Sequence, residues 1–120
     1  MTETLDKGAM TQLLEMVGDD PEFVSDLVDT YLADAPGLLA AMRAAAEAAS
    51  SEGLVRPAHT LKGNSRSIGA TVLAEICRGL EEAGRTGSMN GTAEDVAAAE
   101  AEYQRVVAAL ASAREAGWRA

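Results

Sequence analysis

Both the fold and the functional face of this chain can be traced from one stretch, His59-Thr60-Leu61-Lys62-Gly63-Asn64-Ser65-Arg66-Ser67-Ile68-Gly69-Ala70. Small or apolar residues recur along one side of it at spacings of four and three, the pattern of a helix with one buried face: Leu54, Ala58, Leu61, Ser65 and Ile68. The opposite face carries His59, Lys62, Gly63 and Arg66. The stretch therefore predicts a helix that exposes the only histidine of 120 residues beside two cations.

The rest of the chain has the composition of an all-helical domain. Hydrophobic residues make up 48% and aromatic residues 3%, and runs of β-branched residues are absent, which favours helices over sheets. Caps, prolines and glycines divide the chain into five predicted helices, at about residues 6–17, 21–48, 52–67, 71–85 and 93–115. We predict one all-α domain, residues 1–120, folded as an antiparallel four-helix bundle with a short additional N-terminal helix.

Single residues predict several helix ends. Asp6 is expected to cap the first helix, and Thr92 with Asp95 resembles a capping arrangement at the start of the last one. Gly69 is expected to end the helix that carries His59.

Two prolines fall inside predicted helices. Pro36 is expected to bend the helix over residues 21–48 without ending it, because the apolar stripe continues through it in phase. Pro57 lies beyond the first turn of a helix that starts at Glu52. Either that turn is irregular, or the regular helix begins nearer Val55.

Two apolar stripes and the C-terminal tail complete the predicted core. The stripe of the second helix is Phe23, Leu27, Tyr31, Ala35, Leu38, Met42 and Ala45. The stripe of the fourth helix is Leu73, Ile76, Cys77, Leu80 and Ala83, with Cys77 expected as a small buried hydrophobe and not a reactive thiol. Near the C-terminus, Trp118 either packs on the bundle or projects from it.

Charge and cysteine content restrict the partners and the compartment. A net charge of −9 argues against nucleic acid and anionic membranes as partners. Residues 56–85 hold five cations against three glutamates, a net charge of +2, so the rest carries −11. Such a basic island suits an anionic ligand or partner, although chance clustering of arginines gives the same pattern. One cysteine excludes an internal disulfide, and with no signal peptide or long apolar run it predicts a cytoplasmic protein.

Most motifs of enzymes and cofactor-binding proteins are absent. The sequence has no P-loop and no Gly-x-Gly-x-x-Gly. One histidine and one cysteine do not make a recognisable metal site. Ser65 lies off the face of His59, so the two do not form a nucleophile–base pair. We therefore expect neither autonomous enzyme activity nor a cofactor.

The face of His59 has the properties of a phosphoryl-accepting site, although a lone surface histidine is usually an ordinary residue. Neutral imidazole is a good nucleophile toward phosphorus. Lys62, expected to be exposed, lies about 5–6 Å away between Cβ atoms, within reach of a phosphoryl group on the ring. Gly63 costs about 1 kcal/mol in a helix interior relative to Ala. Its presence indicates either the close approach of a partner or tight packing of a neighbouring helix.

The same residues resemble a known family. The pattern His59-Thr60-Leu61-Lys62-Gly63-x-Ser65-x-x-Ile68-Gly69-Ala70 is similar to the signature of histidine-containing phosphotransfer (HPt) domains of bacterial two-component phosphorelays. The resemblance implies that His59 accepts a phosphoryl group from a phospho-aspartate on a receiver domain and passes it to the aspartate of another. It also implies that Lys62 stabilises the phosphoryl group and that Gly63 leaves room for the receiver's loops.

The resemblance further implies how the domain works with others. Its partners would be receiver domains of response regulators, a hybrid histidine kinase, or both. The receiver would supply Mg²⁺ and most of the catalytic groups, and the HPt domain would act as a monomer. Asn64, Arg66 and Pro57 depart from the family's commonest residues. Arg66 and Arg56, which lie on either side of His59 in the sequence, are further candidates for partner contact.

Four alternatives are less favoured. The phosphotransfer domain of a chemotaxis kinase has a similar motif, but it works with an ATP-binding domain that this sequence lacks. The dimerisation domain of an ordinary histidine kinase has Glu after its histidine, where this chain has Thr60. A helical adaptor that binds a signalling partner without phosphorylation is expected to lose His59, Lys62 or Gly63, and all three are present. An enzyme with His59 as general base needs a second catalytic group.

Overall fold

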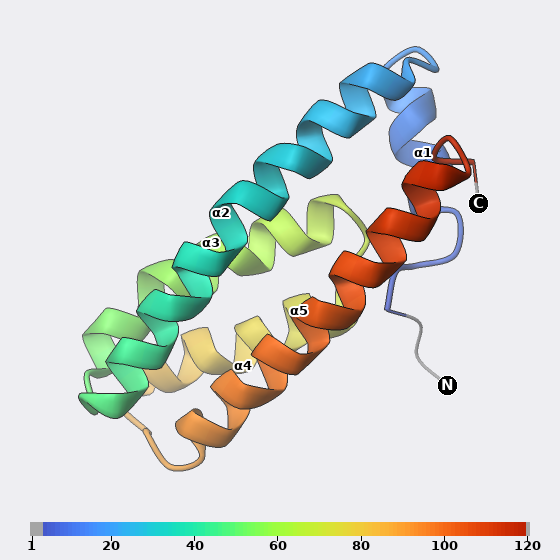
Figure 1. Cartoon of the computed structure of the whole chain (residues 1–120). Coiled ribbons are helices and arrows are strands. Elements are labelled where there is room, and N and C mark those ends of the chain that lie inside the picture. Colours follow the sequence, from blue (N-terminus) through green and yellow to red (C-terminus); the bar gives the residue numbers. More distant parts are fainter. Residues whose placement is uncertain (1–3, 120) are drawn as a thin grey trace.

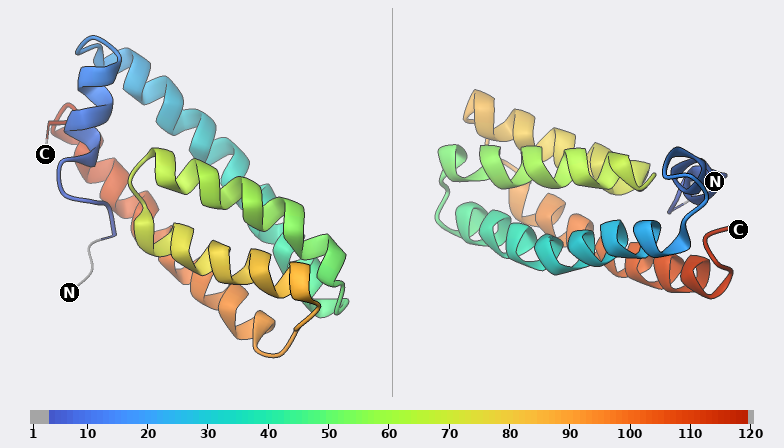
Figure 2. Two further views of the ribbon diagram at one scale, coloured as in Figure 1. Left: turned by 180° about the vertical axis from the view of Figure 1, so that it is seen from behind. Right: turned by 90° about the horizontal axis from the view of Figure 1, so that it is seen from above.

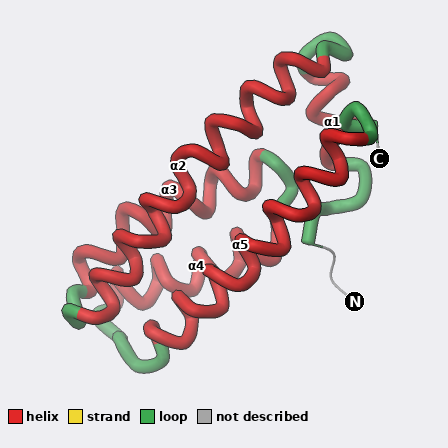
Figure 3. The backbone as a smooth tube through the Cα atoms, viewed as in Figure 1, coloured by secondary structure: helices red, strands yellow, loops and turns green. Residues whose placement is uncertain are grey.

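The structure is a computed structural model that describes residues 4–119 of the chain. Residues 1–3 and 120 of the predicted domain lie outside the described residues. The helices are α1 (Ala9–Met16), α2 (Pro21–Glu47), α3 (Ser51–Ser67), α4 (Thr71–Thr86) and α5 (Thr92–Glu115). Over residues 4–119 the regular structure is entirely helical, which confirms the predicted all-α class (Figure 3).

The four long helices run alternately up and down and form the antiparallel bundle (Figure 1). α3 packs against α2 and α4, and α5 packs against the same two helices. The short helix α1 lies at the end of the bundle where α2 begins and α5 ends (Figure 2). Within residues 4–119 the main helix contacts of α3 are with α2 and α4, so one face of it is left for solvent.

The buried face of α3 is the one that the sequence predicts. Leu54, Ala58 and Leu61 are fully buried, and Ile68 is 4% exposed. Ser65 is also fully buried, and its hydroxyl forms a hydrogen bond of 3.0 Å with the hydroxyl of Tyr31 on α2. This face therefore fixes the rotation of α3 and turns His59 outward.

The buried face of α2 differs from the prediction. Phe23 and Leu27 are 54% and 41% exposed, so their assignment to the core was wrong, and Leu38 is only half-buried. The core side of α2 is Val24, Val28, Tyr31, Ala35, Leu39, Met42 and Ala45. Both stripes have helical spacing and share four residues, so periodicity alone does not choose between them.

The start of the described chain is tied to the turn between α3 and α4. Asp6 was predicted to cap α1, and this prediction was wrong, because α1 begins at Ala9 after a left-handed Gly8. Instead the Asp6 carboxylate accepts a hydrogen bond of 2.8 Å from the Thr71 hydroxyl, and the Asp6 N–H donates to the Gly69 carbonyl at 2.8 Å. Asp6 therefore joins the chain before α1 to the start of α4.

Gly69 ends α3 as predicted. Its φ of +79° favours glycine, and a Cβ there would lie 2.3 Å from the Cβ of Ala9. The predicted cap at the start of α5 was wrong, because the Thr92 hydroxyl donates back to the Met89 carbonyl at 2.9 Å and the N-cap is Gly91.

Neither proline interrupts its helix. α2 runs from Pro21 to Glu47 through Pro36, as expected of a single helix. α3 is helical from Ser51, and the Ser50 hydroxyl caps it by accepting from the Gly53 N–H at 3.1 Å. Both alternatives considered for Pro57 were therefore wrong, since the first turn is helical and begins before Val55.

The buried side of α4 contains three residues that the predicted stripe omits, Ala74, Glu81 and Gly84. Cys77 is fully buried as predicted, and burial raises the pKa of its thiol to about 12, so it does not act as a thiolate. Ile76 and Ala83 are only half-buried. Glu81 takes a buried position on the same side.

Trp118 packs on the bundle. It is 1% exposed, and its Nε1 donates a hydrogen bond of 3.1 Å to the Ser25 hydroxyl on α2. The Arg114 guanidinium lies 5.0 Å from the centre of its ring. The tail after α5 is thus anchored to the N-terminal part of α2.

Candidate functional site

The candidate site is centred on His59, in the middle of α3. Its side chain is 62% exposed, and Nδ1 lies 3.0 Å from Oε2 of Glu81 on α4. Among residues 4–119 the other ring nitrogen, Nε2, has no hydrogen-bond partner. One nitrogen is thus held by the protein, and the other is left without a partner within that range.

Glu81 is a buried carboxylate that accepts hydrogen bonds from three side chains. Its side chain is only 8% exposed. Oε1 accepts from Lys62 Nζ at 2.6 Å, and Oε2 accepts from Arg85 through Nε at 3.1 Å and a terminal nitrogen at 2.7 Å. The hydrogen bond from Lys62, followed by those from Arg85 and His59, lowers the pKa of Glu81 to about 2 against the opposing effect of burial. Glu81 is therefore ionised at neutral pH.

This ionisation determines the tautomer of the neutral imidazole. A carboxylate accepts hydrogen bonds and donates none. The hydrogen of neutral His59 is therefore on Nδ1, where it is donated to Glu81. Nε2 then carries the lone pair, on a side chain that is 62% exposed.

Lys62 is placed differently from the prediction. Its side chain is 16% exposed, so the expectation of an exposed lysine was wrong. The cause is the ion pair with Glu81, which draws Nζ toward α4 and lets the aliphatic stem lie along the surface of the bundle. Lys62 remains one helical turn from His59, but in this state it neutralises Glu81.

Gly63 leaves an open surface beside His59. It is exposed, and a Cβ built there would meet no atom of the described residues within 4 Å. Packing of a neighbouring helix therefore does not explain this glycine. Gly84 of α4 shows the contrast, because a Cβ there would lie 2.8 Å from the Ser51 carbonyl oxygen.

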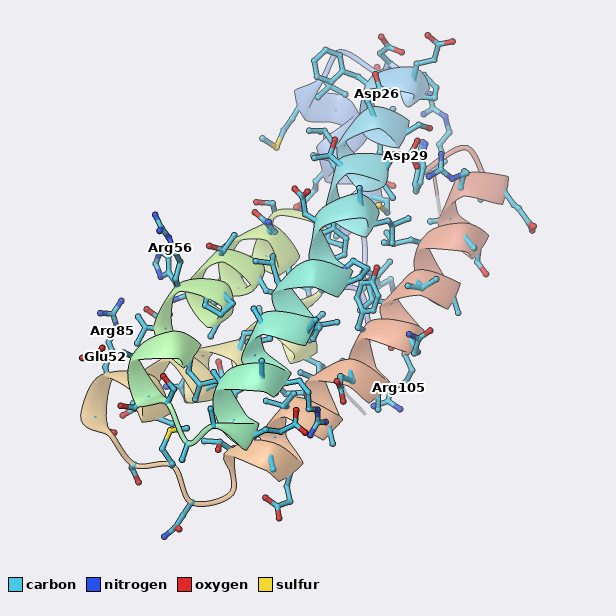
Figure 4. All side chains as sticks on the ribbon, turned by 60° about the vertical axis from the view of Figure 1, so that its left-hand side comes forward. Asp26, Asp29, Glu52, Arg56, Arg85 and Arg105 are labelled. Carbon is cyan, nitrogen blue, oxygen red and sulfur yellow. The ribbon has the colours of Figure 1, made fainter. Side chains whose placement is uncertain are left out.

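Arg56 and Arg66 lie on the exposed surface of α3 without ion-pair partners among the described residues. Arg56 projects outward at the same edge of the molecule as Arg85 (Figure 4). Arg66 borders a hollow of about 240 Å³ between α1 and α3, together with Leu13 and Met16. It is seven residues from His59, roughly 10 Å along the helix. The structure thus brings Arg85, but not Arg66, into contact with the group that binds His59.

Sequence reasoning missed Glu81 and Arg85 as site residues. A signal for Glu81 was present, since it follows Leu73, Cys77 and Leu80 in the apolar register of α4. A carboxylate in such a register needs cationic or hydrogen-bonding partners. Arg85 follows Glu81 by four residues, the spacing of a helical ion pair.

The chain is similar to known phosphotransfer proteins in sequence and in fold. The sequence matches the Hpt domain family over residues 26–109. Over 90 residues it is 32% identical to multistep phosphorelay regulator 1 of Schizosaccharomyces pombe, an alignment that covers 74% of this chain and 30% of that protein. The crystal structure of histidine-containing phosphotransfer protein B from Pseudomonas aeruginosa PAO1 matches with a TM-score of 0.85 at 29% identity, over 96% of this chain and 97% of that one.

The fold is that of a histidine-containing phosphotransfer bundle. The chain belongs to the Hpt domain family. Members of this family carry phosphoryl groups in phosphorelays and work with receiver or kinase partners. The chain spans only 30% of the length of the yeast regulator. Across residues 4–119, no helix is both long and apolar enough to cross a membrane. Nor does that part of the chain gather three or more metal-ligating side chains at one place.

Proposed function

We propose that His59 is the phosphoacceptor of a phosphorelay intermediate. It takes a phosphoryl group from an aspartyl phosphate on a receiver domain and passes it to the aspartate of another response regulator. The observation that carries this proposal is the exposed imidazole whose Nδ1 is held by the ionised Glu81, which leaves Nε2 as the nucleophile.

The transfer step balances on these groups. The lone pair of Nε2 attacks phosphorus, a nitrogen–phosphorus bond forms, and the bond from phosphorus to the aspartyl oxygen breaks with its electron pair going to the carboxylate. The proton on Nδ1 stays in place, so the phosphorylated ring becomes positively charged. The Glu81 carboxylate at 3.0 Å from Nδ1 offsets that charge. The reverse step returns the ring to its neutral tautomer and releases the group to a second aspartate.

The receiver is assigned the remaining catalytic work. In-line phosphoryl transfer depends mainly on positioning and on charge that neutralises the phosphoryl oxygens. We assign Mg²⁺ to the receiver, whose aspartate lies at the reacting phosphorus. Lys62 has three N–H donors on a flexible stem, so it turns to the phosphoryl oxygens when the group arrives.

A partner that reaches His59 also covers an apolar groove between α2 and α3. The groove has a volume of about 260 Å³, and its walls include Leu13, Leu27, Asn64 and Ser67. It begins at Asn64, five residues or about 8 Å along α3 from His59. A typical interface buries about 800 Å² on each partner, a patch roughly 30 Å across. A receiver centred on His59 therefore reaches Leu27, and the receiver surface that faces Leu27 is expected to be apolar.

The proposal is tested by label transfer. The full chain is incubated with phosphorylated receiver domains from its own organism, and acid-labile, base-stable label is followed on wild type and on His59→Gln. Gln keeps a polar side chain toward Glu81 but has no ring nitrogen. Label is expected on the wild type only. Label on the variant places the acceptor elsewhere, and binding of receivers without any label supports a non-phosphorylated adaptor instead.

A further inference from the structure

We propose that Arg85 is a positioning residue for the phosphoacceptor: it holds the Glu81 carboxylate on His59 Nδ1 while Lys62 turns to the phosphoryl group. The inference rests on the proposed function, because it concerns the same histidine. It concerns a residue of α4 that lies 26 positions from His59 in the sequence and makes no direct hydrogen bond to it.

The three side chains that donate to Glu81 are distributed unequally over its two carboxylate oxygens. Lys62 occupies Oε1, whereas His59 Nδ1 and both nitrogens of Arg85 share Oε2. Arg85 therefore determines where the oxygen that binds the imidazole lies. Its planar guanidinium fixes direction as well as charge, which a lysine ammonium does not do.

Phosphorylation of His59 adds a second anionic group with which Lys62 and Arg85 can pair. A phosphoryl group on Nε2 adds negatively charged oxygens close to Lys62. Of the two cations that pair with Glu81, Lys62 is the one on the same helix as His59. If Nζ leaves Glu81, Oε1 loses its only protein donor among the described residues. A buried carboxylate without a cation is strongly destabilised. The contact from Arg85 to Oε2 keeps Glu81 paired, ionised and oriented during that exchange.

The position of Arg85 favours this role over a purely structural one. Its side chain is 59% exposed, and the hydrogen bonds of its guanidinium within the described residues go to Glu81 alone. Arg78, on the same helix, provides a matched comparison. It is 48% exposed and pairs with Glu75 and Glu82, neither of which touches His59.

The test combines a structural and a chemical readout on the full chain. The ¹⁵N chemical shifts of the His59 ring report the fraction of the tautomer with hydrogen on Nδ1. The rate of phosphohistidine formation is measured with phosphoramidate, a small donor whose phosphorus–nitrogen bond breaks with release of ammonia. The variants are Arg85→Ala, Arg85→Lys and the control Arg78→Ala. Arg85→Gln serves if the alanine variant does not fold.

Arg85→Ala is expected to lower the fraction of the Nδ1–H tautomer and to slow phosphorylation about fivefold, the effect of one hydrogen bond. Arg85→Lys should recover part of the rate, and Arg78→Ala should match wild type. Adding Lys62→Ala to Arg85→Ala should slow the reaction by more than the product of the two single effects, because Glu81 then has no cation. The inference is overturned if Arg85→Ala behaves like Arg78→Ala in both readouts. It is also overturned if the rate loss of the double variant equals the product of the two single losses.

The two proposals fail separately. If receivers never label the wild type, the proposed function is wrong. The tautomer measurement needs no phosphoryl donor, so it still decides whether Arg85 positions Glu81 on His59.

Discussion

Replacing Glu81 by glutamine tests the buried centre of the site most sharply. The amide has the same shape as the carboxylate, but only one acceptor oxygen, and its NH₂ group faces donors from Lys62, His59 or Arg85. Hydrogen bonds to charged groups contribute about 1.5–3 kcal/mol each. Arg85 is largely exposed, so a guanidinium N–H that loses its acceptor forms a hydrogen bond with water instead. We therefore expect Glu81→Gln to lower the free energy of unfolding by about 2 kcal/mol. For a domain of this size that corresponds to roughly 8 °C in Tm.

The pH dependence gives a second, independent signature. The contact with Lys62 lowers the pKa of Glu81 from 4.5 to about 2 in the folded protein. Between those values the unfolded chain binds a proton that the folded chain does not, so stability rises with pH in this window. The contribution of Glu81 is complete above about pH 4.5 and is lost as the pH falls through about 2. Glu81→Gln should therefore differ from wild type near neutrality and converge with it at low pH.

Urea unfolding at several pH values measures both effects. The matched control is Glu82→Gln, the next residue on α4, which is 67% exposed and pairs with Arg78 at the surface. Its effect should stay within about 0.5 kcal/mol at every pH. Equal effects of the two substitutions, or a Glu81→Gln variant with the same pH slope as wild type between pH 2 and 4.5, would refute the claim that Glu81 is the ionised centre.

Three further substitutions test other parts of the account. Gly63→Ala adds a methyl group where no atom of residues 4–119 lies within 4 Å, so the free energy of unfolding should rise by up to about 1 kcal/mol. Phosphoryl transfer from receivers should slow, and unchanged transfer means that no partner approaches this position. Leu27→Glu should raise the KM for a phosphorylated receiver about tenfold, a change of about 1.4 kcal/mol, and leave the rate with phosphoramidate unchanged. Ala108→Glu, on the exposed side of α5, is its control, and equal effects of the two argue against the α2–α3 groove as a docking surface. Trp118→Ala should cost about 3–5 kcal/mol in urea unfolding, and a loss below about 1 kcal/mol shows that the tail does not anchor the bundle.

The sequence predicted the bundle because local rules act within each helix. The spacing of Leu54, Leu61 and Ile68 placed His59 on the exposed face of α3, and the structure agrees. Gly69 ends α3 because its left-handed conformation is a local property of the chain. Such features depend on neighbouring residues, which the sequence shows directly.

The misses required knowledge of how distant segments meet. The stripes led by Phe23 and by Val24 are both helical, and only the positions of α3 and α5 decide which one is buried. The sequence left open whether Trp118 packs on the bundle, because its partner Ser25 lies at the other end of the chain. Lys62 turns out half-buried because α4 presents Glu81 to it, 19 residues later. Periodicity along one helix contains none of these contacts.

The most direct test of the central claim is transfer of labelled phosphoryl from a phosphorylated receiver to the full chain, compared between wild type and His59→Gln. We predict acid-labile, base-stable label on wild type, chased onto a second receiver, and none on the variant, with both proteins equally folded. Label that persists in His59→Gln, or wild type that accepts none from any receiver of its organism, would contradict His59 as the phosphoacceptor.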